Sequence, residues 1–221
     1  GHSLGEFSAL AAVRAISLAD TARLLKLRGR VMQQAVPVGE GAMAALLGAD
    51  LATATAAAAE GAKLGVCQVA NDNAPGQVVI SGSKQAVEVA IAIAKEMGVK
   101  RGMMLPVSAP FHCVLMQPAA DAMATALAAT KIIDPLVLLI ANVTAAPVDD
   151  ADEIRGLLVA QVTSLVRWRE SVEYMAANEI DTIVELGAGK VLTGMAKRIN
   201  PELRALSVGT PQEVEAFLKT V

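Results

Sequence analysis

The 221-residue sequence has few aromatic side chains and almost no excess of either sign of charge. It contains 3 Phe, 1 Tyr and 1 Trp, and 19 Lys and Arg stand against 22 Asp and Glu, for a net charge of −3. Nucleic-acid binding usually requires a basic surface and aromatic rings that stack on bases, and this chain offers neither. We therefore expect no nucleic-acid partner.

The sequence also lacks an uninterrupted apolar segment of membrane-spanning length. Its longest uncharged run, from Gly102 to Ala120, is divided by Pro106, Pro110 and Pro118. Three prolines within one such run predict buried strand, loop and helix start rather than a span. No signal-peptide pattern opens the chain, so we expect no membrane association and a cytoplasmic location.

Cysteine is scarce, because only Cys67 and Cys113 occur and neither belongs to a CxxC pair. This pattern argues against both a disulfide framework and a zinc site, so we expect two buried thiols and no metal. Asn142 opens an Asn-Val-Thr glycosylation motif, which is a chance match without a secretory signal. Because 54% of the residues are hydrophobic, the chain can form a compact core in one or two domains.

Hydrophobic periodicity and turn residues predict alternating helices and strands. The expected helices cover 4–14, 18–35, 51–60, 83–97, 114–129, 151–163 and 168–178, with another from 190. The expected strands cover 42–48, 64–70, 77–82, 101–106, 136–141 and 181–186, and a last strand and helix lead to Val221. The alternation of strands and helices after residue 105 favours an α/β fold with a mainly parallel sheet there.

The middle of the chain has its own order of elements. Residues 39–105 read βαββαβ, the order of the split ferredoxin-like unit. We therefore predict a small ferredoxin-like domain at 39–105, inserted into a larger domain formed by 1–38 and 106–221.

The first five residues fit G-x-S-x-G, the motif that holds a nucleophilic serine on a sharp turn before a helix. In such a turn the positions of Gly1 and Gly5 are expected to leave no room for side chains. The helix N-terminus directs backbone amides at a developing oxyanion, and the Leu4 N–H is the expected donor. The alternative is that Ser3 is merely a glycine-flanked helix cap.

A serine nucleophile needs a base, and the chain has only two histidines. His2 adjoins Ser3, where neighbouring side chains diverge, so His112 is the candidate base. The alternative is that His112 is a core histidine in an apolar segment. A Ser-Asp-His hydrolase has its histidine late in the chain, after an acid. Here 109 residues follow His112, which allows a backbone or amide carbonyl as the third member.

Five motifs occur in a characteristic order along essentially the whole chain. They are Gly-His-Ser-Leu-Gly-Glu (1–6), Leu-Arg-Gly-Arg (27–30), Asn-Ala-Pro-Gly-Gln-Val-Val-Ile-Ser-Gly (73–82), Val-Ser-Ala-Pro-Phe-His (107–112) and Gly-Ala-Gly-Lys-Val-Leu (187–192). The sequence thereby resembles the malonyl-CoA:acyl-carrier-protein transacylases of type II fatty acid synthesis. The resemblance implies an α/β-hydrolase-like core with a short parallel sheet, and a monomer when complete.

The resemblance also implies roles for individual residues. Ser3 would be the acyl-accepting nucleophile and His112 its base, while Gln161 would orient the histidine through its backbone carbonyl. Malonyl-CoA and acyl carrier protein would be substrates, so no bound cofactor is expected. The reaction would be ping-pong, through a malonyl-serine. The rival functions are a serine esterase or thioesterase, and a non-catalytic carrier-protein-binding fragment.

Selectivity for malonyl requires recognition of one carboxylate, which a planar guanidinium can hold through two hydrogen bonds. From the residues alone Arg23, Arg28 and Arg30 are equal candidates, and each could instead lie on a solvated helix face. The resemblance singles out Arg28. It also marks Phe111 as typical of malonyl rather than branched-acyl enzymes, because a ring there would crowd an α-methyl group.

Further residues are candidates for binding surfaces. Asn71, Asn73 and Gln77 are expected to line the cleft between the domains, although turn residues before a strand need no functional reason. Two basic pairs are expected to dock the acidic carrier protein, with ordinary surface charge as the alternative: Lys100, Arg101, Lys197 and Arg198. Gly187-Ala188-Gly189-Lys190 fails the phosphate-loop pattern and predicts a structural strand-to-helix turn.

The family also has an N-terminal segment with the first sheet strands and a Gly-Gln-Gly turn that completes the oxyanion hole. None of this precedes Gly1 in the sequence. We therefore expect residues 1–221 alone to be poorly soluble or nearly inactive, and the added segment to restore malonyl transfer.

Overall fold

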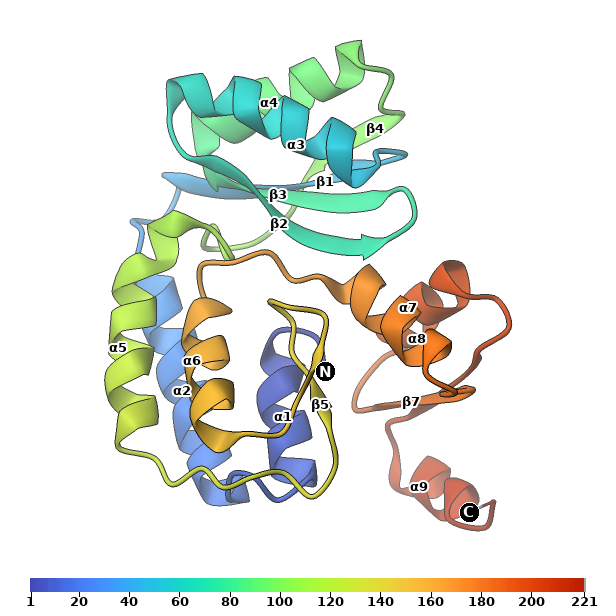
Figure 1. Ribbon diagram of the computed structural model, residues 1–221. Helices are drawn as coiled ribbons and strands as arrows, with labels where there is room; N and C mark the ends of the chain where they lie inside the picture. The colour runs from blue at the N-terminus through green and yellow to red at the C-terminus, as the bar shows by residue number, and fades with distance from the viewer. Residues whose placement is uncertain (221) are drawn as a thin grey trace.

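The computed structural model describes residues 1–220 and shows a mixed α/β fold (Figure 1). Its helices are α1 (Leu4–Ala12), α2 (Leu18–Gln34), α3 (Leu51–Gly61), α4 (Lys84–Glu96), α5 (Gln117–Ala128), α6 (Ala151–Ala160), α7 (Trp168–Ala177), α8 (Val191–Ile199) and α9 (Pro211–Phe217), with short 3-10 turns η1 (Ala62–Leu64) and η2 (Val114–Met116). Its strands are β1 (Gly41–Leu47), β2 (Cys67–Ala74), β3 (Gln77–Ser83), β4 (Arg101–Met104), β5 (Leu139–Ile140), β6 (Pro147–Val148), β7 (Thr182–Leu186) and β8 (Arg204–Val208). Val221, the predicted end of the last helix, lies outside the described residues.

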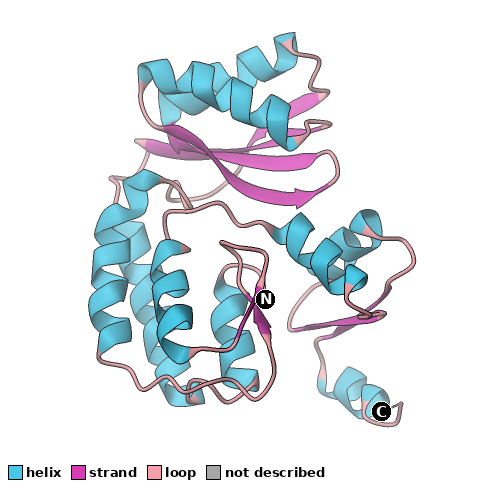
Figure 2. Cartoon of the chain, viewed as in Figure 1, coloured by secondary structure: helices cyan, strands magenta, loops and turns pink. Residues whose placement is uncertain are grey.

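Strands β1 to β4 form one antiparallel sheet in the order β2-β3-β1-β4, and α3 and α4 cover one of its faces (Figures 1 and 2). Because side chains alternate along a strand, Ala44 and Leu46 of β1 enter the core beneath these helices. Met43 and Ala45 enter a separate apolar cluster on the opposite face. Both faces of this strand are therefore buried.

The second face of the sheet looks toward a group of helices formed by α1, α2, α5 and α6 (Figure 1). Phe7, Leu10, Met123 and Leu158 are fully buried between them. Helix α2 begins at the Ser17 cap, whose hydroxyl accepts a hydrogen bond from Asp20 N. This arrangement brings the start of α1 and the middle of α2 beneath the sheet.

The mainly parallel sheet expected after residue 105 is found only in part. There, β7 and β8 form a parallel ladder, whereas β5 and β6 pair antiparallel. The strand expected over 136–141 shrinks to β5, which pairs with β6 in a short hairpin. The side chains of 136–138 are exposed, so apolar sequence alone did not indicate burial there.

Within residues 1–220, no helix combines the length and the apolarity needed to cross a bilayer. Cys67 and Cys113 are both buried, and neither forms a disulfide within the described residues. Burial raises the pKa of the Cys67 thiol to about 11.

Candidate active site

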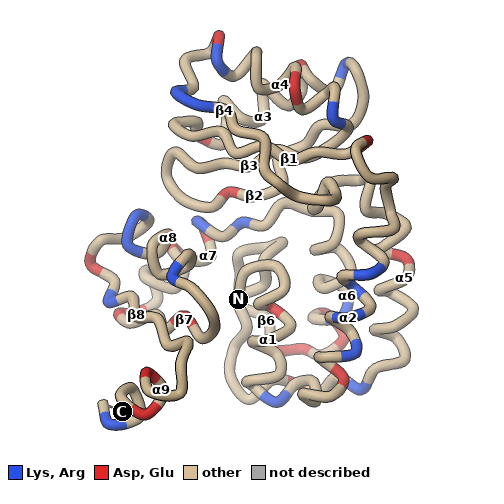
Figure 3. Tube along the Cα trace, turned by 180° about the vertical axis from the view of Figure 1, so that it is seen from behind, with Lys and Arg blue, Asp and Glu red and all other residues tan. Residues whose placement is uncertain are grey.

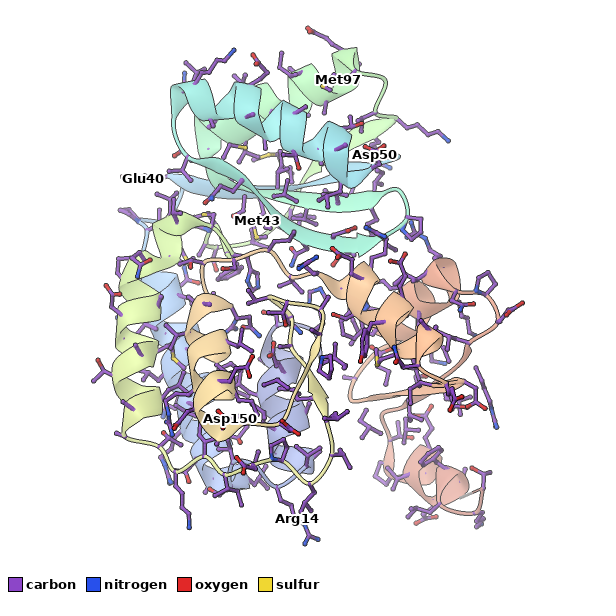
Figure 4. The ribbon with its side chains drawn as sticks, viewed as in Figure 1. Arg14, Glu40, Met43, Asp50, Met97 and Asp150 are labelled. Atoms are coloured by element: carbon purple, nitrogen blue, oxygen red, sulfur yellow. The ribbon has the colours of Figure 1, made fainter. Side chains whose placement is uncertain are left out.

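A cavity of about 360 Å³ lies between the antiparallel sheet and the helices. Its walls come from both parts of the chain: His2, Ser3, Arg28, Gly29, Met32, Met43, Asn71, Leu105, Val107, Phe111 and His112. Met43, labelled in Figure 4, lies on the face of the sheet that looks toward the helices. Residues more than 100 positions apart in the sequence thus meet around one space.

Ser3 stands at the N-terminus of α1 in a strained backbone conformation, with φ 50° and ψ −105°. Its hydroxyl makes no capping hydrogen bond, so the helix-cap alternative does not describe this serine. A side chain at Gly1 would overlap the carbonyl of Gly5, whereas one at Gly5 would meet nothing within 4 Å among the described residues. The expectation that a side chain has no room is therefore confirmed at Gly1 and wrong at Gly5.

Asn142 holds the strained turn from both sides. Its Oδ1 accepts a hydrogen bond from Ser3 N at 2.7 Å, and its Nδ2 donates to Gly1 O at 2.8 Å. The residue is 1% exposed, which removes any role for the glycosylation motif that it opens. Strained backbone persists where its surroundings over-determine it, and Asn142 supplies that constraint.

Ser3, His112 and Gln161 form a hydrogen-bonded chain. His112 Nδ1 lies 2.8 Å from the backbone oxygen of Gln161, and its Nε2 lies 2.8 Å from Ser3 Oγ. A carbonyl can only accept, so Nδ1 carries the proton and Nε2 is left to accept from the serine hydroxyl. A serine hydroxyl, an imidazole and a backbone carbonyl are thus in contact in the order that nucleophilic catalysis needs, and no acidic side chain of residues 1–220 is hydrogen-bonded to the imidazole.

The His112 imidazole is neutral at physiological pH. Burial, together with the charge of Arg28, lowers its pKa to about 3. A neutral ring can accept the serine proton, whereas an imidazolium could not. His112 itself has a left-handed backbone, with φ 59°, in the turn that directs its ring into the site.

Arg28, on α2, is the buried cation of the cavity, with 7% of its surface exposed. One Nη atom lies 3.0 Å from Ser3 Oγ and 3.0 Å from Gln161 Oε1. Its Nε is buried without a hydrogen-bond partner in the described part of the chain. Burial lowers the pKa of Arg28 to about 10, so the guanidinium remains charged at neutral pH. Arg23 and Arg30, the other two candidates on α2, are exposed.

Glu6 is a second buried ionisable residue, in the first turn of α1 and 1% exposed. Its Oε2 accepts hydrogen bonds from Gln161 Nε2 at 2.7 Å and from Asn142 N at 3.2 Å. Burial raises the pKa of this carboxyl, while the hydrogen bond from Gln161 lowers it. The Gln161 amide therefore lies between the Glu6 carboxyl and the Arg28 guanidinium.

The three polar residues expected to line the cleft between the domains, Asn71, Asn73 and Gln77, lie on β2 and β3 and have different surroundings. Asn71 lines the cavity, and Asn73 Oδ1 lies 2.9 Å from His2 Nε2. Irregular pairing at 69–71 and 72–74 lets consecutive residues of β2 face the buried side. Gln77 is not among the cavity residues, because it follows the hairpin turn and accepts a hydrogen bond from Arg198 at 2.5 Å.

His2 behaves as the sequence predicted, since its side chain diverges from Ser3. It bonds to Asn73 and lies against Trp168, with ring centroids 5.5 Å apart. Burial lowers the pKa of His2.

Phe111, next to the candidate base, lines the cavity and also packs against the helical core.

The four basic residues expected to dock a partner are all exposed, and Figure 3 shows Lys and Arg beside β4 and on α8. Arg101 and Gln77 flank Leu47 on neighbouring strands, and Arg198 reaches Gln77 and Pro75 O from α8. The two pairs thus meet at one end of the sheet. That end is four residues along β1 from Met43, or roughly 13 Å from the cavity wall.

The Gly187–Gly189 turn connects β7 to α8, and both glycines have positive φ. Glu185 accepts hydrogen bonds from Leu192 N and Thr193 N at the start of α8. An acidic side chain already occupies this helix N-terminus, which agrees with a structural turn.

Asn142 and Glu6 were missed as site residues in the sequence. Glu6 belongs to the first motif, and its place three residues after the serine was a usable signal for a buried role. Asn142 follows a weak two-residue strand, and no local pattern connects it to Ser3.

Comparisons with known proteins converge on one group. A family model described as "Acyl transferase domain" matches residues 1–210. The malonyl CoA-acyl carrier protein transacylase of Escherichia coli (strain K12) is 48% identical over 219 residues, which is 99% of this chain and 71% of that protein. The crystal structure of acyl-carrier-protein-S-malonyltransferase from Bartonella henselae is 55% identical with a TM-score of 0.96, covering 100% of this chain and 70% of that one. A second structure, a malonyl-transacylase in complex with its type II PKS acyl-carrier protein, is 41% identical with a TM-score of 0.96, covering 100% of this chain and 72% of that one.

Proposed function

The chain belongs to the malonyl CoA-acyl carrier protein transacylases, and from that membership we propose that it transfers a malonyl group from malonyl-CoA to the pantetheine thiol of acyl carrier protein in fatty acid biosynthesis. One observation carries the proposal for the site: a buried guanidinium lies 3.0 Å from the hydroxyl of a serine that is bonded to a neutral histidine. In malonyl, the carboxylate and the thioester carbonyl are separated by one methylene. A group that binds the carboxylate must therefore lie beside the nucleophile.

In the first half-reaction, Ser3 Oγ attacks the thioester carbonyl carbon while His112 Nε2 takes the hydroxyl proton. The Leu4 N–H, at the start of α1 and without an acceptor in its own helix, stabilises the oxyanion. The carbon–sulfur bond then breaks, and His112 returns the proton to the thiolate of CoA. The products are malonyl-serine and free CoA.

In the second half-reaction, His112 takes the proton of the carrier protein's pantetheine thiol. The thiolate attacks the malonyl-serine carbonyl, the bond to Ser3 Oγ breaks, and the histidine protonates the serine. The backbone oxygen of Gln161 holds the histidine ring through both steps, because the ring N–H stays bonded to it at 2.8 Å.

Arg28 binds the malonyl carboxylate in this scheme. Its unpartnered Nε supports this role, because buried donors without partners are rare and a carboxylate oxygen would satisfy one. Phe111 limits the space beside the acyl group and disfavours an α-methyl branch. Asn71 lines the same cavity, and Asn73 fixes His2 at its edge.

The test is to incubate the protein with labelled malonyl-CoA, trap the acyl-enzyme, and repeat the incubation with acyl carrier protein. We expect stoichiometric malonyl-enzyme without carrier protein and malonyl-carrier protein in its presence. Release of free malonate would instead favour the esterase or thioesterase. Absence of labelling would favour a carrier-binding fragment without activity.

We propose that Lys100, Arg101, Lys197 and Arg198 form the docking surface for acidic carrier protein. Reversal of three of these charges, in Lys100→Glu, Arg101→Glu and Lys197→Glu together, should slow transfer to carrier protein about tenfold at low salt. Labelling by malonyl-CoA should be unchanged, and the difference should shrink at high salt. Lys26→Glu, an exposed position on α2, is the control. Equal slowing of both half-reactions would contradict the docking role.

For the architecture, we propose an α/β-hydrolase-like core at 1–38 and 106–221, with a ferredoxin-like small domain at 39–105. The small domain is supported by its strand order, β2-β3-β1-β4, and by its own apolar core beneath α3 and α4. The larger domain is supported by the parallel β7–β8 pair and by the strained serine before α1. The cytoplasmic location stays a prediction from the sequence.

A further inference from the structure

The Gln161 side chain makes hydrogen bonds that the orienting role of its backbone does not require. Its Oε1 accepts a hydrogen bond from the Arg28 guanidinium at 3.0 Å. Its Nε2 donates to Glu6 Oε2 at 2.7 Å and to Ser3 O at 3.1 Å. One residue therefore contacts the base through its backbone and the malonyl-binding arginine through its side chain.

The orientation of this amide determines whether Arg28 is held. In the observed orientation an acceptor faces the guanidinium. If the amide were turned over, its NH₂ group would face Arg28, and two donors would oppose each other in a buried site. Glu6 Oε2, which also accepts from Asn142 N, and the backbone oxygen of Ser3 are both acceptors beside this amide, so they permit only the observed orientation.

Glu6 is well placed for this function, because its position is fixed from two directions. It lies in the first turn of α1, and the same Oε2 that accepts from Gln161 also accepts from Asn142 N. The carboxylate is buried and does not reach the cavity lining. It can therefore act on substrate only through other residues.

We infer that Glu6 is a positioning residue for malonyl selectivity, which sets the Gln161 amide and thereby holds Arg28 beside Ser3 in the geometry that binds a carboxylate. This inference rests on the proposed function, since it assigns Arg28 to the malonyl group. We expect its effect to be larger for acyl groups that carry a carboxylate, because the base is held independently by the Gln161 backbone.

Two conservative variants separate the position of the acceptor from its charge. Glu6→Gln keeps the reach of the side chain, and its amide oxygen can accept from both donors. Glu6→Asp keeps the charge but withdraws the acceptor by one methylene. We expect Glu6→Asp to lower the ratio of malonyl-serine to acetyl-serine formation about tenfold, and Glu6→Gln to keep it within about threefold of the unmodified protein.

The ratio is measured from the rates of acyl-enzyme formation with malonyl-CoA and with acetyl-CoA. Glu88→Asp and Glu88→Gln, at an exposed position of α4, are the matched controls and should leave the ratio unchanged. Equal slowing with both substrates would show a merely structural role and overturn the inference. Loss of selectivity in Glu6→Gln but not in Glu6→Asp would also overturn it, because charge rather than position would then matter.

A second readout does not depend on turnover. Binding of free malonate is followed through the NMR signal of the Arg28 Nε–H, and we expect the affinity to fall in Glu6→Asp and to persist in Glu6→Gln. If the unmodified protein formed no malonyl-enzyme yet showed this pattern, the proposed function would fail and the positioning role would stand. Unchanged malonate affinity in Glu6→Asp would overturn the positioning role alone.

Discussion

Ser3→Ala should abolish malonyl labelling while leaving the protein folded. The hydroxyl is the atom acylated in the proposed reaction, and it touches both His112 Nε2 and Arg28. Loss of a serine nucleophile removes the covalent route entirely, so we expect a fall of about 10⁴-fold or more. The measurement is the amount of label retained by denatured protein after incubation with labelled malonyl-CoA.

The matched control is Ser8→Ala, which alters an exposed serine one turn further along α1. It should label like the unmodified protein. Because α1 makes no capping bond through the Ser3 hydroxyl, the Ser3 variant should also unfold at a similar temperature. Stoichiometric labelling of a folded Ser3→Ala protein would refute the nucleophile assignment.

His112→Ala should slow both half-reactions by about 10²–10⁴-fold, which is the usual range for loss of a general base.

Arg28→Ala should reverse the preference between acyl groups. The variant removes the only guanidinium among the described cavity residues, so malonyl-serine formation should fall about 10²-fold. Acetyl-serine formation should be retained or increase, because an uncharged acyl group no longer shares the cavity with an unpaired buried cation. The measurement compares labelling rates with malonyl-CoA and acetyl-CoA.

Arg30→Ala is the control for this variant, since Arg30 lies two residues further along α2 and is exposed. It should leave both rates unchanged. Removing Arg28 also removes one cause of the lowered pKa of His112, so acetyl transfer by Arg28→Ala should become more sensitive to acid. Equal losses with malonyl and acetyl would show that Arg28 supports the fold rather than selectivity.

Local sequence was sufficient for the parts of this protein that depend on neighbouring residues. The helix at 18–34, the hairpin of β2 and β3 and the turn before α1 follow from periodicity, caps and glycine placement over short stretches. Each of these features depends on a few neighbouring residues, so it forms wherever the same local sequence pattern occurs. The position of His112, with 109 residues after it, also allowed a backbone or amide carbonyl as its partner, and the backbone oxygen of Gln161 lies 2.8 Å from His112 Nδ1.

Tertiary structure alone decided which distant residues meet. Nothing near Asn142 in the sequence indicates that it holds the backbone of Ser3, and nothing near Gln77 indicates that the hairpin carries it away from the cavity. The choice among three arginines of α2 likewise depends on which face of the helix packs inward, and only Arg28 does. Local patterns report propensity and burial tendency, whereas the direction of a buried polar side chain is set by partners that the fold brings from elsewhere in the chain.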